Sequence, residues 1–228
     1  MRLPLLAAAA LATLAATAAP AATRDFPVQG FSQVDLLGAA DVTIRTGAGY
    51  SVHAEGDPQL IDRLTADVRQ GVLVLGWKSG SWTHGSSGNL RIAITMPRAT
   101  SVALGGAGSI DLDQGSGPAF GASVAGAGTI RVAAVHVDRT VLSMSGTGHI
   151  AIAGNTGAID ARTSGVGSID AAGLTAKSGN LTMSGTGQIH ARVDGPAEVT
   201  MSGIGHITVD GHPTCTVYKS GLGDIHCG

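Results

Sequence analysis

The sequence predicts an all-β, single-domain fold in which the chain winds into a parallel β-helix, or β-solenoid, with repeating coils. The first observation is a motif, Gly-x-Gly-x-Ile, that recurs between Leu104 and Ile225 at intervals of 18 to 20 residues. The second is that apolar and polar residues alternate on both sides of each motif, which is typical of half-buried strands. Repeats of this length cannot bury an apolar face alone, so we expect coils of about 20 residues to stack on one another.

Residues 1–22 are interpreted as a secretory signal peptide. Met1 and Arg2 precede an apolar run from Leu3 to Leu14, and small residues that suit cleavage follow it. The run is rich in alanine and falls short of the ~20 strongly apolar residues of a membrane-spanning helix. We therefore expect an exported protein with no transmembrane segment in its mature chain, located in the periplasm, at the outer-membrane surface or outside the cell.

Residues 23–100 are expected to form strands that cap the first coil and continue into it as one domain. Alternating or apolar runs predict strands at 34–36, 41–44, 72–75 and 90–94, and residues 37–40 look like a degenerate copy of the glycine bend. Residues 57–68 give a short helical signal, because Asp57-Pro58 precedes apolar Leu60, Ile61 and Leu64.

Residues 101–228 hold the repeats, and their isoleucines predict the core. The second glycine of each motif is followed two positions later by an isoleucine: Ile110, Ile130, Ile150, Ile169, Ile189, Ile207 and Ile225. Stacked strands would place these side chains on top of one another as a buried ladder. The glycines stand where the backbone needs a positive φ or comes too close to its neighbour for a Cβ atom.

The two cysteines fall on the two predicted strands of the last coil. Cys215 and Cys227 both have inward parity, and export would place them where disulfides persist. We expect a bond between them that stops the end coil from fraying. The alternative is a pair of small buried apolar side chains.

Composition excludes several classes of protein. The 35 glycines follow no Gly-x-y triplet, so the chain is not collagen-like. The formal net charge is −2 and no basic stripe with interleaved aromatic residues is present, so nucleic acid is not an expected partner. No motif calls for a cofactor.

The order of these segments resembles one known family. Residues 31–34, 41–44, 71–75 and 92–97, followed by repeated Ser-Gly-x-Gly-x-Ile, are similar to the GIN domain, commonly described as the head of autotransporter adhesins. The resemblance covers nearly all of the chain after the signal peptide. It implies a secreted, β-helix-like bacterial cell-envelope domain of unknown function, and it supplies no catalytic residues.

The outward positions give little support to catalysis. Three residues after each second glycine the chain reads Asp111, Arg131, Ala151, Asp170, His190, Thr208 and His226. The two aspartates would lie three coils apart, or about 14 Å, which is too far for paired acid and base work on one glycosidic bond. A carbohydrate-active β-helix enzyme, a polysaccharide lyase or hydrolase, remains the alternative to a non-catalytic module.

Histidines near the C-terminus are the candidate metal ligands. His190, His206, Asp224 and His226 would lie in the last coils, and zinc accepts such nitrogen and oxygen ligands. The alternative is an ordinary solvated surface. A row of hydroxyls, including Ser143, Thr182 and Thr200, is interpreted in the same way, because Arg162 and Tyr218 interrupt it.

The one concentration of aromatic residues lies between two predicted strands. Trp77, Trp82 and His84 could form a contact patch for a ligand, since tryptophan anchors many interfaces. Both indoles could instead fold down as a lid on the end of the helix. Together the patterns favour a non-catalytic envelope module for adhesion, scaffolding or surface binding, with a cell-surface glycan or an envelope protein as partner.

Overall fold

The structure is a computed structural model that describes residues 21–78 and 89–228. The helix α1 spans Pro58–Arg63. The N-terminal strands are β1 (Ala22–Asp25), β2 (Gln33–Leu36), β3 (Ala39–Thr46), β4 (Ser51–Gly56), β5 (Leu64–Arg69), β6 (Val72–Trp77) and β7 (Leu90–Met96). The strands of the repeats are β8 (Ser101–Leu104), β9 (Ala107–Ser116), β10 (Ala119–Val124), β11 (Ala127–Met144), β12 (Thr147–Thr163), β13 (Val166–Met183), β14 (Thr186–Val193), β15 (Pro196–Met201), β16 (Ile204–Gly211), β17 (Thr214–Lys219) and β18 (Leu222–Cys227).

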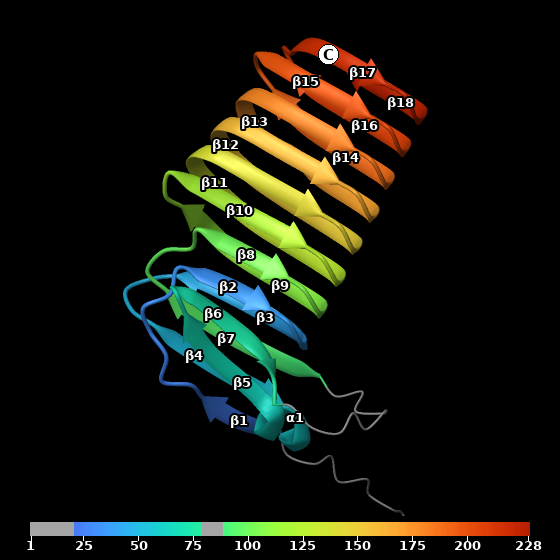
Figure 1. Cartoon of the computed structure of the whole chain (residues 1–228). Coiled ribbons are helices and arrows are strands. Elements are labelled where there is room, and N and C mark those ends of the chain that lie inside the picture. The colour runs from blue at the N-terminus through green and yellow to red at the C-terminus, as the bar shows by residue number, and fades with distance from the viewer. Residues whose placement is uncertain (1–20, 79–88) are drawn as a thin grey trace, which may run out of the picture.

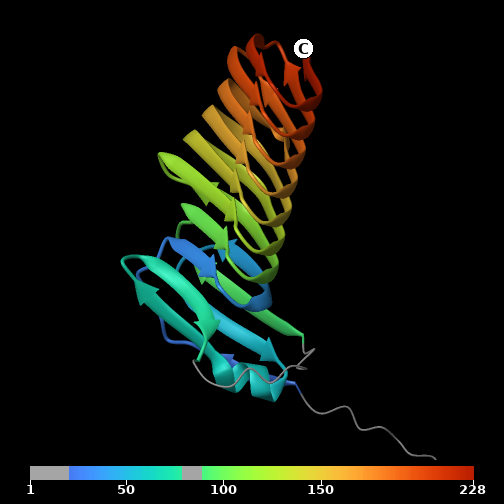
Figure 2. The same ribbon diagram turned by 45° about the vertical axis from the view of Figure 1, so that its right-hand side comes forward.

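The repeats wind into a β-solenoid, as predicted, and their coils stack in parallel along one axis (Figure 1). Each coil has two main walls joined at the Gly-x-Gly bend. The first wall comprises β2, β8, β10, β15, β17 and the C-terminal ends of β11, β12 and β13. The second wall comprises β3, β9, β14, β16, β18 and the N-terminal parts of β11, β12 and β13. The side view shows the same stack with the C-terminus at its far end (Figure 2).

The core is the predicted isoleucine ladder. Ile130 pairs in register with Ile110 on one side and with Ile150 on the other, and the match continues to Ile225 in the last coil. From Ile110 to Ile207 these side chains are at most 1% exposed. The opposite wall supplies facing apolar rows, such as Val102, Ala122 and Leu142. Burial of these branched side chains is the main source of stability.

The degenerate bend predicted at residues 37–40 is part of the solenoid. Ala40 pairs with Gly108 and Val42 with Ile110, so β2 and β3 form a coil of the same register as the repeats. Gly108 has a φ of 117°, a value that disfavours any side chain. On its other side β3 pairs with the strand β7, so among the described residues no glycine bend stacks against Ala40 from that side.

The N-terminal end is closed by antiparallel strands and a helix. β4 pairs with β7, β1 pairs with β4, and β5 pairs with β6, all antiparallel. The helix begins after Asp57, whose side chain accepts a hydrogen bond from the Gln59 N–H at 2.8 Å. The prediction of a helix up to residue 68 was wrong beyond Arg63, because Leu64 turns extended and β5 pairs with β6 instead.

Candidate binding site

A groove of about 470 Å³ lies on the outer face of the second wall and crosses the coils of β3, β9, β11, β12 and β13. Its small apolar surfaces include Ala133, Ala151 and Ala153. Its charged groups are Arg45, Asp111, Asp113, Arg131 and Asp170. A mainly apolar hollow with a few polar groups at its edges is the usual form of a ligand site.

The repeat positions the charged groups, and two irregularities shape the hollow. Asp111, Arg131, Ala151 and Asp170 are successive partners in register, so they form one outward row. The register shifts after Val132 and after Ala151, where extra residues interrupt the pairing of neighbouring coils. Such bulges bend a strand locally and often adjoin functional sites. These bulges cannot be predicted from the sequence, because the length of each return segment does not reveal where the pairing slips.

The carboxylates in the groove each have a local partner. Asp111 lies 3.7 Å from Arg131, and both side chains are about half exposed, so this ion pair is weak. Asp113 accepts hydrogen bonds from the Thr46 N–H at 3.0 Å and the Gln114 N–H at 2.6 Å, and so ties β9 to β3. Asp170 accepts from the Ala172 N–H at 3.1 Å.

These partners leave one unpaired cation at the groove. Arg45 is exposed and makes no ion pair or side-chain hydrogen bond with any other residue that the structure describes. Asp111 and Asp170 are separated by the coils of β11 and β12, about 14 Å at β spacing. The arrangement offers mixed charges to a ligand rather than two carboxylates converging on one bond.

The predicted metal ligands do not come together. His190 contacts Asp210 at 2.7 Å, and His206 lies 3.7 Å from Asp224. His226 shares a row with His190, but Thr208 lies between them, so the two imidazoles are two coils apart. No group of three or more potential ligands was found among residues 21–78 and 89–228. These residues therefore lie in separate histidine–aspartate pairs on a solvated face, and metal binding by His190, His206, Asp224 and His226 stays a prediction.

Comparison with known proteins shows the family and the fold. The family model described as "Putative auto-transporter adhesin, head GIN domain" matches residues 30–213. The chain belongs to this family. No curated protein matches the sequence.

Solved structures share the fold of this GIN domain. A crystal structure of a "putative adhesin" from Bacteroides fragilis NCTC 9343 is 18% identical, with a TM-score of 0.84, and the match covers 92% of this chain and 98% of that one. A "putative adhesin" from Parabacteroides merdae ATCC 43184 is 16% identical, with a TM-score of 0.64 and coverage of 92% and 96%. A "putative lipid binding protein" from Parabacteroides distasonis ATCC 8503 is 16% identical, with a TM-score of 0.66 and coverage of 92% and 97%.

The structure describes only one residue of the predicted aromatic patch, Trp77. In the GIN domain Trp77 ends β6, is partly buried against the core, and lies with its indole over Gly38. Trp82 and His84 lie outside the described residues. Trp77 thus covers the first coil, and a contact role for all three residues stays a prediction.

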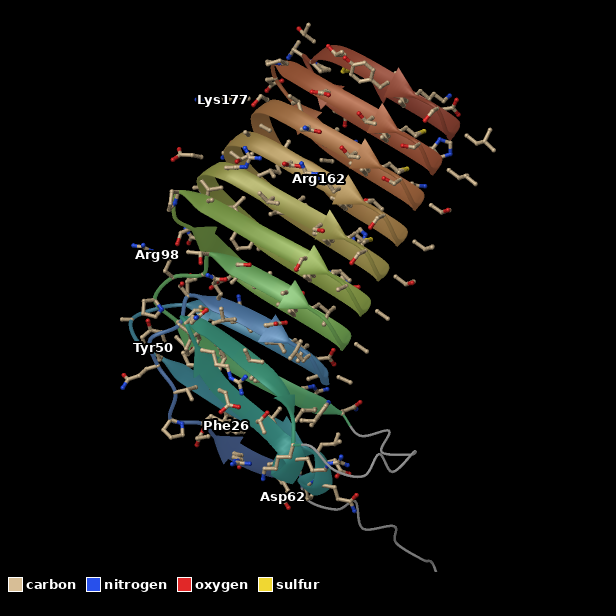
Figure 3. The ribbon with its side chains drawn as sticks, in the orientation of Figure 1. Phe26, Tyr50, Asp62, Arg98, Arg162 and Lys177 are labelled. Carbon is tan, nitrogen blue, oxygen red and sulfur yellow. A yellow bond between two sulfur atoms is a disulfide. The ribbon has the colours of Figure 1, made fainter. Side chains whose placement is uncertain are left out.

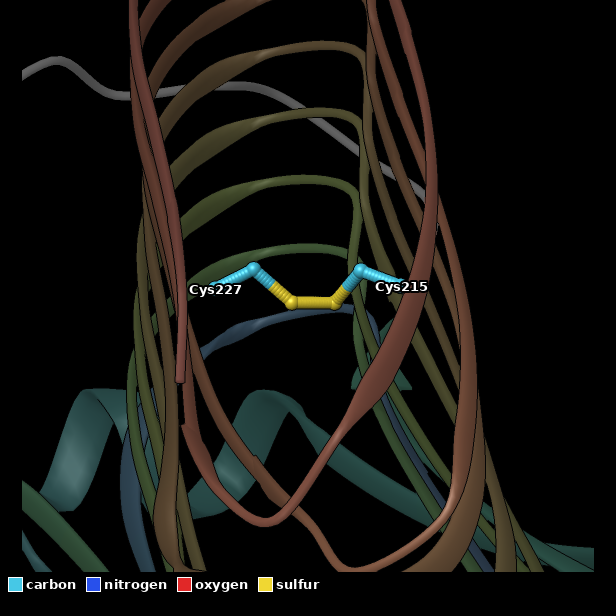
Figure 4. The surroundings of a disulfide bond; sticks show 2 residues. All are labelled: Cys215 and Cys227. Carbon is cyan, nitrogen blue, oxygen red and sulfur yellow. A yellow bond between two sulfur atoms is a disulfide. The ribbon is translucent and has the colours of Figure 1, made fainter.

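The last coil of the GIN domain contains a disulfide between Cys215 and Cys227 (Figure 4). Their Cα atoms are 6.6 Å apart, and the bond joins β17 on the first wall to β18 on the second. It crosses the interior at the level where the other coils place apolar side chains. Among the described residues this coil pairs only with β15 and β16, so the bond lies at the least supported end of the described solenoid.

A cluster on the first wall was not foreseen. Asp160 has outward parity between inward Ile159 and Ala161, and yet its side chain is only 7% exposed. Arg139 contacts it at 3.0 Å and Arg162 at 2.7 Å. The sequence showed Arg162 only as an interruption of the hydroxyl row. Arg139 lies in a different coil, so no local pattern links it to Asp160.

Proposed function

We propose that this GIN domain is an exported, non-catalytic module that binds a cell-surface glycan in the groove of the second wall. The single observation behind the proposal is the groove itself, which combines alanine surfaces with mixed, locally partnered charges. A sugar ring has apolar faces and polar edges, and such a hollow suits both. The adhesin family to which the chain belongs points to surface binding.

Export is part of the proposal and rests on residues 1–22. Their charged start, apolar run and small residues fit a cleavable signal peptide. We infer that residues 23–100 and 101–228 then fold as one continuous domain, because β2 and β3 continue the register of the repeats. No described helix has the length and hydropathy needed to cross a bilayer.

Retention on cells tests the binding proposal. The purified, fluorescently labelled chain is applied to intact bacteria and to a glycan array. Reversing two groove charges in R45E/R131E should lower retention and glycan binding at least tenfold. The matched control R69E/K177E makes the same charge change at two exposed positions away from the groove, and should bind like the wild type.

Equal retention of the two folded variants would refute the groove as the binding site. If the protein is retained on cells but gives no signal on the glycan array, the partner is an envelope protein rather than a glycan. The enzymatic alternative is read from the same samples, since a lyase or hydrolase would release new chain ends from a bound polysaccharide. If the wild type releases new chain ends and R45E/R131E does not, the groove is an active site and the non-catalytic proposal is wrong.

A further inference from the structure

Asp160, on the first wall, is the only charged residue that is buried in the part of the chain that the structure describes. Asp160 interrupts the alternation of β12, because a residue of outward parity should be exposed. Two arginines cover it instead. Arg139 approaches one carboxylate oxygen from the neighbouring coil, and Arg162 approaches the other from two positions along the same strand.

One carboxylate neutralises only one of the two guanidinium groups. The cluster of Arg139, Asp160 and Arg162 therefore has a net charge of about +1, although the whole chain is formally −2. Asp138 and Glu198 are the other acidic residues of this region. Neither forms an ion pair with the two arginines in the part of the chain that the structure describes.

The buried carboxylate forms an ion pair with both arginines and accepts a hydrogen bond from Arg139. Their side chains are 57% and 54% exposed, so each has N–H groups directed at solvent after it has contacted Asp160. A guanidinium presents its donors as a rigid fork that matches the two oxygens of a carboxylate. Figure 3 shows Arg162 on the open outer face of the first wall.

Hydroxyls flank this fork along the stacking direction. Ser143 and Thr182 are the register partners of Arg162 in the coils on either side, and Ser123 and Thr200 extend the row by one more coil each. The spacing of about 4.8 Å between coils makes this a regular series of polar contacts on both sides of one cation.

We propose that Arg139 and Arg162 form a second binding site, which takes the carboxylate of an acidic sugar in a polysaccharide, while the hydroxyl row contacts the neighbouring sugars. The site lies on the first wall and does not depend on the groove of the second wall.

A net-neutral double variant tests the proposal without changing the overall charge. D160N/R162Q removes one guanidinium and, at the same time, the buried carboxylate that would otherwise lose a partner. The control D67N/R69Q makes the same two changes, also two positions apart, at exposed residues of β5. Both are compared with the wild type by calorimetric titration with polygalacturonate and with neutral dextran.

The wild type and D67N/R69Q should bind polygalacturonate equally, D160N/R162Q at least tenfold more weakly, and none of them should bind dextran. R162K, which keeps the charge but loses the fork, should also bind at least several-fold more weakly. The proposal is overturned if D160N/R162Q and its control bind polygalacturonate equally. It is also overturned if R162K binds polygalacturonate as tightly as the wild type, or if the wild type binds dextran with equal affinity. Cell retention through the groove should be unchanged in D160N/R162Q, so failure of one site is distinguishable from failure of the other.

Discussion

The carbonyl oxygen of Gly128 occupies the space into which a Cβ atom on Gly148 would project. Gly148 in turn blocks the same space at Gly167, so the bends stack backbone on backbone along the solenoid. The glycines therefore set the distance between coils at one corner, while the isoleucines fill the interior behind it. Both the stacking of the glycine bends and the packing of the isoleucines depend on the register that pairs Ile130 with Ile150.

Replacing a bend glycine should force two coils apart. We expect Gly148→Ala to lower the free energy of unfolding by about 2 kcal/mol or more, in the range of a backbone clash that cannot relax. Gly76→Ala is the control, because the nearest atom to its new Cβ is the Thr65 hydroxyl at an ordinary 3.6 Å. Urea unfolding followed by circular dichroism measures both. Equal stability of the two variants would contradict the stacking of the bends.

Truncating the core ladder should also destabilise the fold. Ile150 is 0% exposed and has an isoleucine on each side. Ile150→Ala should cost about 2–5 kcal/mol through lost burial and the cavity left behind. Thr147→Ala, at an exposed position of the same strand, should change stability by less than about 0.5 kcal/mol. A loss below about 1 kcal/mol at Ile150 would argue against a tightly packed interior.

Removing the disulfide should loosen the C-terminal coil first. The bond closes a loop with a sequence separation of 12, which corresponds to about 3 kcal/mol in the chain-entropy model. In C215S/C227S, amide hydrogen exchange should accelerate in β17 and β18 and stay slow in β11 and β12. A uniform acceleration along the whole solenoid would mean that the bond supports the fold globally rather than its end.

Asp35 should make stability depend on pH. Burial raises the pKa of its carboxyl above the ordinary value, and its register partners Val74 and Ala103 offer no compensating charge. A raised pKa means that the folded state binds the proton more tightly than the unfolded state does. The free energy of unfolding therefore falls as the pH rises from the ordinary aspartate pKa to the raised one. Asp35→Asn should melt at a higher temperature than the wild type at pH 7. The difference should shrink as the pH falls from the raised pKa to the ordinary aspartate pKa, and a difference that grows on acidification would refute this assignment.

Much of the fold could be predicted because its signals are local and repeated. The ladder from Ile110 to Ile207 follows from alternation and a fixed period, and so does the coil that ends in the degenerate bend at residues 37–40. The site could not be predicted in the same way. The bulges after Val132 and Ala151 and the contact between Arg139 and Asp160 depend on how separate coils align. The row His190, Thr208 and His226 could be read from the repeat, but the pairing of His190 with Asp210 could not, because it depends on how side chains of neighbouring coils turn.

Deleting one complete coil tests the stacking model most directly. Removal of residues 128–147 joins Ala127 to Gly148 and brings positions that are equivalent in the repeat next to each other. The shortened chain should unfold cooperatively, keep its β-sheet circular dichroism, and become shorter by about 4.8 Å in solution scattering. Removal of only residues 138–147 should prevent folding, because it deletes the first-wall strand of one coil and leaves the strands on either side of it without their partner. If both deletions abolish folding, or if both are tolerated equally, the stacked-coil account is contradicted.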